Sequence, residues 1–317
     1  MPPLLYLAPL HGVTNRIFRK AFFNHFSGFD GVMAPFVLAV DTDQLKKNHF
    51  KDLLPFDASG IPVVPQLLGN DPFAFVKTAR YLAGLGYAEV NWNLGCPYPM
   101  VANKKRGSGL LPFPGMIEKI LEEVCAKQDI ALSVKLRLGR YESQEIINLM
   151  PILNRYPLKK VIIHPRIGTQ MYKGEVSLDG FAEALSLCRH PVMYNGDIKD
   201  EATFAQLQKR FPSVTEWMIG RWAIANPFLP EQIKKTDRSA PAPHLSDPVA
   251  VIRAFHDELY GSYREALSGP AHLLDKMKEI WSYLGRSFPS NAAGVDRIIR
   301  SKTVEAYDQA VSAILSP

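Results

Sequence analysis

Short apolar runs recur along the chain up to residue 220, with longer amphipathic segments between them. Several runs have almost no polar alternation, such as VVPQLL at 63–68 and VIIH at 161–164. This pattern is typical of parallel strands covered on both faces. The runs predict strands at Leu4–Ala8, Gly31–Pro35, Val63–Leu68, Ala88–Leu94, Ala131–Leu138, Lys160–His164, Pro191–Asn195 and Glu216–Gly220.

The segments between these strands have helical spacing. The segment 71–85 opens with Asp-Pro, a capping residue followed by a proline at the first helical position. Its spacing predicts burial of Phe73, Phe75, Val76, Tyr81 and Leu82. The segment 114–127 has a similar pattern. Eight strand–helix units over roughly 235 residues predict a (β/α)₈ TIM barrel. An open doubly wound sheet is the main alternative, but it often has G-x-G-x-x-G after the first strand, where this chain has Pro-Leu-His-Gly at 9–12.

The pattern changes near Ser239. The stretch SAPAPHLSDP has three prolines and is typical of a linker. Beyond it the apolar residues follow helical spacing only, at 252–263 and 273–284, and two further helices are expected at 295–300 and 304–315. We therefore expect a barrel domain over 1–240 and a small C-terminal helical bundle over 246–317.

The composition supports a folded chain, with 47% hydrophobic and 21% charged residues. The net charge of +6 permits a polyanionic partner without requiring one. No apolar run approaches the roughly 20 residues that span a bilayer, so no membrane partner is expected. Three cysteines and an N-terminus without signal-peptide features predict a cytoplasmic protein. We expect it to be a monomer.

Chemistry in such a barrel takes place on loops at the carboxyl ends of the strands. Polar residues gather there in this sequence, whereas a barrel that only folds needs apolar fillers, so they predict a ligand site. They are Gln66, Asn93, Lys135, Arg137, His164, Arg166, Asn195, Asp197 and Arg221.

Gly196 and Gly220 stand where the last two strands turn toward helices. Either alone is as well explained as a turn residue, but together they favour the phosphate site common in barrels, with Arg221 as a charged partner. Lys135 could form a Schiff base or hold an anionic ring, although it or Arg137 could instead belong to a structural ion pair.

His164 alone would more often be a core histidine. Arg166 lies on the same strand face two residues later, which favours ligand contact by both. Cys96 follows a strand between Gly95 and Pro97, on a constrained loop, and could be a nucleophile, a general acid or a buried structural residue. No cysteine or histidine spacing fits zinc, so no metal is expected.

Lys104, Lys105 and Arg106 precede a flexible Gly-Ser-Gly. Such a basic segment is either a solvated face or a mobile lid that closes on a phosphate-bearing substrate.

The motifs together resemble those of the tRNA-dihydrouridine synthases. N-x-G-C-P with H-x-R-x-x-x-Q-x-Y-x-G, in this order, is the specific part of the resemblance, and the C-terminal segment LLDKMKEIWSYLG resembles the family's second domain more weakly. The matching segments are LAPLHGVTNRIFR (7–19), VPQLLG (64–69), NWNLGCPYPMV (91–101), GSGLL (107–111), SVKLRLG (133–139), HPRIGTQMYKGE (164–175), NGDI (195–198) and MIGRWAIANP (218–227).

The resemblance implies an FMN-dependent barrel that reduces the C5=C6 bond of selected uridines in tRNA, with NADPH as reductant and Cys96 as general acid. It places Asn93 near the reacting base and Arg137 and Arg166 toward the substrate. It also implies cofactor contacts. Gln66, Lys135 and His164 would contact the flavin ring, and Ala8, Pro9 and Leu10 would contribute backbone. Asn195, Gly196, Gly220 and Arg221 would form the phosphate cradle, with Asp197 as a further cofactor-binding residue.

The sequence departs from the family pattern at Leu10, Met100, Pro165 and Ile167, and Tyr98-Pro99 stiffens the segment after the cysteine. A base inside folded RNA must be splayed out to reach a barrel mouth, which requires additional surface to grip phosphates. The basic residues Arg297, Arg300 and Lys302 in the helical region are candidates for it, together with the segment 104–106.

Three alternatives remain open from the sequence. A flavin barrel acting on a free small molecule would have no use for the helical region. A non-catalytic RNA-binding barrel would be colourless when purified. An aldolase would form a Schiff base at Lys135, which borohydride would trap.

Overall fold

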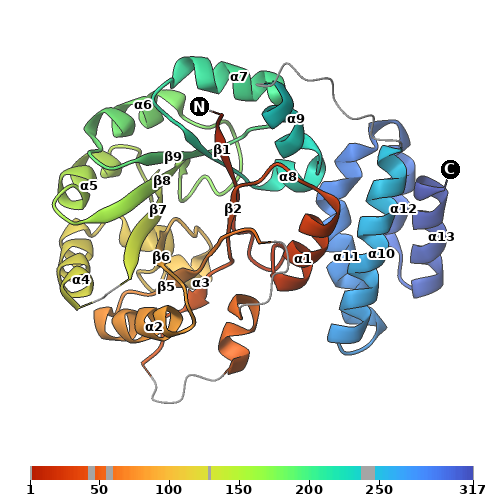
Figure 1. Cartoon of the computed structure of the whole chain (residues 1–317), viewed down its shortest axis with the longest axis horizontal. Coiled ribbons are helices and arrows are strands. Elements are labelled where there is room, and N and C mark those ends of the chain that lie inside the picture. Colours follow the sequence, from red (N-terminus) through yellow and green to blue (C-terminus); the bar gives the residue numbers. More distant parts are fainter. Residues whose placement is uncertain (1, 42–46, 55–59, 128–129, 237–246, 317) are drawn as a thin grey trace.

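Parallel strands form the centre of the molecule in the computed structural model, which describes residues 2–41, 47–54, 60–127, 130–236 and 247–316 (Figure 1). Their order in the sheet is β3-β5-β6-β7-β8-β9-β10-β1-β2-β4. The strands are β1 (Leu4–Leu7), β2 (Gly31–Met33), β3 (Val37–Leu38), β4 (Val63–Val64), β5 (Gln66–Leu68), β6 (Glu89–Leu94), β7 (Ala131–Gly139), β8 (Leu158–Ile167), β9 (Val192–Asn195) and β10 (Glu216–Ile219).

The two ends of this sheet meet at Pro65. Only this residue separates β4 from β5; β4 pairs with β2, and β5 pairs with β6. Proline has no N–H to give to the ladder, which explains the interruption, while its carbonyl accepts from the Asn91 amide at 2.8 Å. The sheet thus closes, and the eight predicted strands and the TIM barrel are confirmed.

Helices cover the outside of the barrel. They are α1 (Arg16–His25), α2 (Pro72–Gly84), α3 (Pro99–Ala102), α4 (Pro114–Lys127), α5 (Glu145–Leu153), α6 (Leu178–Leu187), α7 (Glu201–Arg210), α8 (Arg221–Ala225) and α9 (Leu229–Thr236), with 3₁₀ turns at Lys47–Leu53 and Gly107–Leu110. Asp71 caps α2, its side chain accepting from the amides of Phe73 and Ala74. The predicted burial of Phe73 is wrong: its side chain is 63% exposed, because it lies in the first turn and faces solvent.

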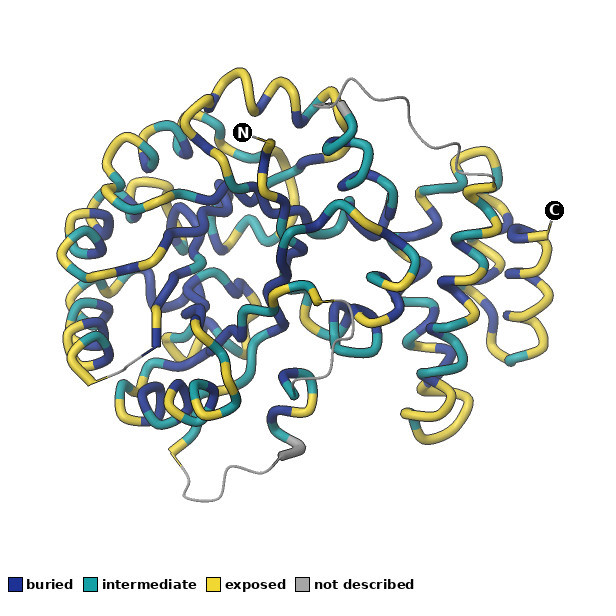
Figure 2. Tube along the Cα trace, viewed as in Figure 1, coloured by how far each residue is buried: buried dark blue, intermediate teal, exposed yellow. Residues whose placement is uncertain are grey.

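The C-terminal region is helical, as predicted, and packs on α1 (Figures 1 and 2). The Phe255 ring meets Phe18, Phe22 and Phe26 edge-on, with centroids 5.1–6.1 Å apart. The elements are α10 (Pro248–Ala266), α11 (Pro270–Leu284), α12 (Ala292–Arg300) and α13 (Val304–Leu315), with 3₁₀ turns at Gly285–Ser287 and Pro289–Asn291. Most of the predicted linker, and the domain limits at 240 and 246, lie outside the described residues.

Candidate active site

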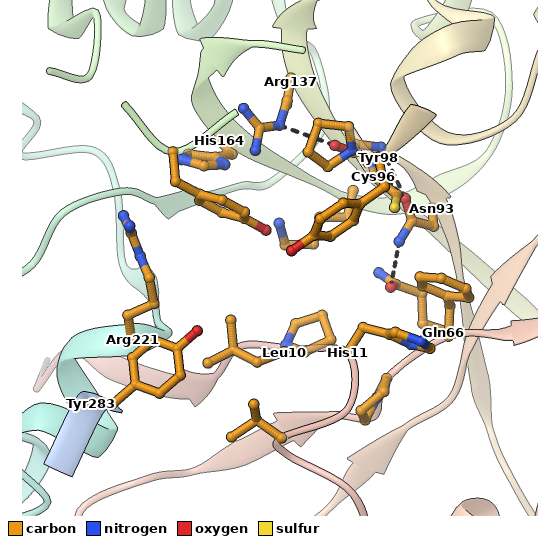
Figure 3. Close-up of a pocket in the computed structure, with 18 of the residues that line it drawn as sticks. Leu10, His11, Gln66, Asn93, Cys96, Tyr98, Arg137, His164, Arg221 and Tyr283 are labelled. Atoms are coloured by element: carbon orange, nitrogen blue, oxygen red, sulfur yellow. Dashed lines mark hydrogen bonds between the residues drawn. The ribbon is translucent and has the colours of Figure 1, made fainter. Parts of the chain in front are cut away.

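A cavity of about 240 Å³ opens at the carboxyl ends of the strands (Figure 3). A smaller one of about 60 Å³ shares part of its wall. The predicted residues lining the larger cavity are Pro9, Leu10, Gln66, Asn93, Cys96, Lys135, Arg137, His164 and Arg221. The smaller cavity adds Ala8, Asn195, Gly196, Asp197 and Gly220. Residues far apart in the sequence therefore meet at one barrel mouth.

The loop that carries Cys96 is held on two sides. The Asn93 side-chain oxygen accepts from the amides of Gly95, at 3.0 Å, and Cys96, at 2.8 Å. The Ser108 amide and hydroxyl both donate to the Cys96 carbonyl at 3.0 Å. Gly107 has a φ of +54°, and a Cβ there would lie 2.7 Å from the Cys96 carbonyl oxygen. The close approach of these two segments thus requires glycine.

Cys96 borders the larger cavity, and the residue is 9% exposed. Burial raises its pKa, while the Tyr98 backbone amide and the charges of Arg137 and Lys135 oppose that shift. The thiol therefore keeps its proton at neutral pH. The same amide and cations favour the thiolate that would remain after proton transfer.

Lys135 is a cation facing the cavity. Burial lowers its pKa to about 7, and the charge of Arg137 acts in the same direction. Among the residues that the structure describes, its ammonium has no hydrogen-bond or ion-pair partner. A bound anion would supply the missing countercharge and raise this pKa again.

Arg137 connects the loops after β6 and β8. Its guanidinium donates to the carbonyls of Gly95 at 3.0 Å, Ile167 at 2.9 Å and Met171 at 2.6 Å. Because these contacts are to backbone carbonyls, Arg137 holds the two loops in place and also adds a positive charge to the cavity wall. In the described part of the chain no carboxylate pairs with it, unlike the ion pair considered from the sequence.

Arg166 is buried and lines neither cavity. Its guanidinium pairs with Asp197, which also pairs with Arg221 at 3.0 Å. Burial, reinforced by the charges of Arg137 and Lys135, lowers the pKa of His164 well below its usual value, so the ring is neutral. Its Nε2 lies 3.2 Å from the Arg166 guanidinium and can accept from it. The predicted substrate role of Arg166 stays a prediction.

Two glycines shape the smaller cavity. A Cβ on Gly196 would lie 2.2 Å from the Tyr194 hydroxyl oxygen, and one on Gly220 would lie 3.3 Å from the Ala8 Cβ. Gly220 directly precedes α8, and Arg221 begins it. The cavity beside them is small and bordered by a guanidinium, which suits a phosphate group.

Tyr172 lines the site but was not among the residues predicted for it. It lines both cavities, and its ring centre lies 5.2 Å from the Arg137 guanidinium carbon and 4.8 Å from that of Arg221. Its place within the motif at 164–175 was the available signal. Tyr283 and Arg286 also line the larger cavity, from the helical region, and no local pattern points to them.

Five predicted substrate-binding cations lie outside both cavities, namely Lys104, Lys105, Arg106, Arg297 and Arg300. The Lys105 ammonium lies 4.4 Å from the centre of the Phe113 ring, and Arg300 pairs with Asp296 at 3.0 Å. Their contact with substrate stays a prediction.

No three histidine, cysteine, aspartate or glutamate side chains in the described ranges are grouped to hold a metal ion. A membrane-spanning helix is likewise absent from the described part of the chain, since each helix is too short or too polar.

Comparison with known proteins matches residues 6–303 to the family model described as dihydrouridine synthase (Dus). The tRNA-dihydrouridine synthase B of Vibrio vulnificus is 30% identical over 269 residues, covering 82% of this chain and 81% of that protein. The tRNA-dihydrouridine(16) synthase of Cupriavidus necator is 27% identical over 311 residues, covering 95% of each.

The similarity of this chain to solved structures supports the fold only. The old yellow enzyme from Trypanosoma cruzi superposes with a TM-score of 0.53 at 11% identity, over 75% of this chain and 89% of that one. An old yellow enzyme homologue from Zymomonas mobilis has a TM-score of 0.54 at 13% identity, with the same coverage. Since the family model spans nearly the whole sequence, the chain belongs to the dihydrouridine synthase family of oxidoreductases.

Proposed function

We propose that this enzyme reduces the C5=C6 bond of a uridine in tRNA to give dihydrouridine, with FMN as cofactor, NADPH as reductant and Cys96 as general acid. The observation that carries the proposal is a protonated thiol, Cys96, at the same cavity as the Lys135 amine, which has no hydrogen-bond or ion-pair partner among the described residues. The names of the relatives support tRNA as the substrate.

The cavity residues fit FMN in charge. Lys135, Arg137 and Arg221 border the two cavities, whereas Asp197 is the carboxylate there among the described residues, so an anionic ligand is favoured. When bound, FMN would supply the hydride that adds to C6 of uracil. We assign the ring to Gln66, Lys135 and His164, backbone contacts to Ala8, Pro9 and Leu10, and the phosphate to Asn195, Gly196, Gly220 and Arg221, with Asp197 orienting Arg221.

Cys96 holds the proton that adds to C5. Because burial raises the pKa of the thiol, the proton stays on Sγ until the carbon becomes basic. Asn93 keeps the loop in place through the amides of Gly95 and Cys96. We place the target base between this loop and the cofactor, near Asn93 and Arg137. The family membership of the chain argues against the Schiff-base alternative for Lys135.

We further propose that the C-terminal helices and the segment 104–106 bind the RNA backbone, and that the enzyme acts in the cytoplasm. Arg297 and Arg300 lie near the end of α12 and are exposed. Phosphate contacts of this kind hold the RNA while one base is turned out of the stack.

The decisive experiment is to map dihydrouridine in tRNA from a strain lacking this gene and then restore the wild-type or the Cys96→Ala protein. We expect wild type to restore the modification and Cys96→Ala to bind tRNA without restoring it. Cys125→Ala, a matched cysteine outside both cavities, should behave as wild type. Full activity of Cys96→Ala would exclude the general-acid role.

We propose position 16 as the modified uridine. The relative whose name carries that position aligns over 95% of both chains, including the C-terminal helices, whereas the Vibrio vulnificus relative covers 82% of this chain. The same mapping tests this point, because a loss of dihydrouridine at another position with position 16 intact would contradict it.

A further inference from the structure

A chain of buried amide groups runs down the barrel interior from the Cys96 loop. The Asn93 side-chain nitrogen donates to the Gln66 oxygen at 2.7 Å, and the Gln66 nitrogen donates to the Asn91 oxygen at 2.8 Å. Gln66 and Asn91 are fully buried. Each carboxamide could be turned over without changing its shape, so something else must decide which end faces which neighbour.

The chain continues to the amino end of β6. The Asn91 nitrogen lies 2.9 Å from the Ser133 hydroxyl, which lies 2.6 Å from one oxygen of Glu89. The other Glu89 oxygen pairs with the Lys159 ammonium at 2.7 Å. A carboxylate can only accept hydrogen bonds, so Glu89 accepts at both oxygens.

This carboxylate fixes the direction of the hydrogen bonds from its end, and the backbone amides of Gly95 and Cys96 require the same direction at the other end. Ser133 must donate its one proton to Glu89, so it must accept from Asn91. Asn91 then presents its oxygen to Gln66, and Gln66 presents its oxygen to Asn93. The Asn93 oxygen is thereby turned toward the backbone amides that hold the Cys96 loop.

The direction of these hydrogen bonds also determines which donor and acceptor groups Gln66 and Asn93 present to a ligand in the larger cavity. Both Gln66 N–H groups are used, one by Asn91 and one by the Met33 sulfur at 3.1 Å. Asn93 uses its oxygen for the loop and one N–H for Gln66. The cavity is left with an N–H donor from Asn93 beside an acceptor from Gln66.

We propose that Glu89 is a positioning residue that, through Ser133 and Asn91, sets the orientation of the Gln66 and Asn93 amides and so holds the Cys96 loop. Its importance for turnover rests on the proposed function of Cys96, but the orientation itself does not. The proposal therefore has a test that does not depend on dihydrouridine formation.

Glu89→Gln is the informative change. The Lys159 ammonium would attract the new amide oxygen, which leaves the amide N–H₂ group facing Ser133. This favours the opposite direction for each hydrogen bond between Ser133 and Asn93. Asn93 would then point N–H groups at the amides of Gly95 and Cys96, and the loop would lose both bonds. Glu89→Gln with Lys159→Met removes this bias, so the amide oxygen can again accept from Ser133.

The readout is the rate at which iodoacetamide alkylates Cys96 in the full-length protein as purified, followed by peptide mass spectrometry. Cys125 and Cys188 serve as references within each molecule. We expect Cys96 to react at least about fivefold faster in Glu89→Gln, the factor for losing one of the two net hydrogen bonds to the loop, and to react within about twofold of the wild-type rate in the double variant.

Two further variants separate orientation from general damage. Ser133→Ala interrupts this series of hydrogen bonds and should also raise the alkylation rate of Cys96. Lys159→Met should not restore the rate in this variant. Glu216→Gln breaks the ion pair of Glu216 with Lys160, which is not part of this series of hydrogen bonds. It should leave the alkylation rate of Cys96 unchanged.

Equal rates in Glu89→Gln and in its double variant with Lys159→Met would overturn the proposal, as would an equal effect of Glu216→Gln. Failure of the wild type to form dihydrouridine would reject the proposed function instead, and would leave the alkylation result standing.

Discussion

At the scale of single residues, Lys135 opposes folding when no ligand is bound. Its pKa of about 7 in the folded chain compares with an ordinary value of 10.5. Between those pH values the unfolded chain binds more protons than the folded one, so the free energy of unfolding rises with pH across that window. The destabilisation is complete below pH 7.

Lys135→Met should therefore stabilise the cofactor-free protein while weakening FMN binding. We expect its Tm at pH 7 to exceed that of wild type by about 2 °C or more, with the difference shrinking toward pH 10. Scanning calorimetry from pH 6 to 10 would measure this, with Lys119→Met, an exposed change on α4, as control. A pH-independent difference would show that Lys135 is not the titrating group.

Gly107 offers a second test at this scale. Gly107→Ala would place a methyl group 2.7 Å from the Cys96 carbonyl oxygen, in a backbone conformation that favours glycine. We expect kcat to fall by at least about tenfold, because an ångström-scale displacement of a reacting group is sufficient for such a loss. Gly86→Ala has a positive φ but open space around it, so it should lose stability and keep kcat. Equal losses of kcat in both would point to backbone strain alone.

The sequence predicted which polar residues meet at the mouth because parallel strands bring their carboxyl ends to one edge. It could not show that Arg166 turns to Asp197 or that Tyr172 lies between Arg137 and Arg221. Those contacts join side chains from separate loops, and their geometry is decided by packing rather than by local spacing.

At the scale of elements, the strand pattern was predicted well because buried parallel strands are short and continuously apolar. The prediction did not show the break of one strand into β4 and β5, although Pro65 stood in the run, nor the full length of β8, which reaches Ile167. Polar residues end β8, and an apolar pattern therefore stops early at His164.

The contact between α1 and α10 yields a prediction about elements. Phe255 is fully buried against Phe18, Phe22 and Phe26. Phe255→Ala should lower the free energy of unfolding by about 3–5 kcal/mol, from lost burial and the cavity left behind. Denaturant unfolding would measure it, with the exposed Phe73→Ala as the matched change expected to have little effect. A small loss at Phe255 would mean that the two helices are not held by this contact.

At the scale of the whole molecule, the net charge of +6 comes from the barrel part of the sequence: residues 1–245 carry 29 Lys and Arg against 22 Asp and Glu, whereas residues 246–317 carry 8 against 9. RNA binding by the helices would therefore depend on where particular cations lie and not on the net charge of that region. If Arg297 and Arg300 each contact one phosphate, replacing both with glutamine should weaken tRNA binding and reduce the slope of log K against log salt by about 2. Binding measured over a salt series would show this.

The control is Lys119→Gln with Lys127→Gln on α4, across the barrel from the helical region (Figure 1). It removes the same charge and should leave the slope unchanged. Equal effects of the two pairs would mean that net charge, rather than a defined surface, draws the RNA.

The wall of the larger cavity includes Tyr283 and Arg286, which belong to the C-terminal region. Deleting residues 246–317 would thus damage the reaction chamber together with any RNA contact, and would not distinguish a tRNA enzyme from a small-molecule reductase. A chimera that exchanges the C-terminal helices between two such enzymes would receive part of a different cavity wall together with a different RNA-binding surface. Its specificity for the modified nucleotide and its kcat should consequently change together.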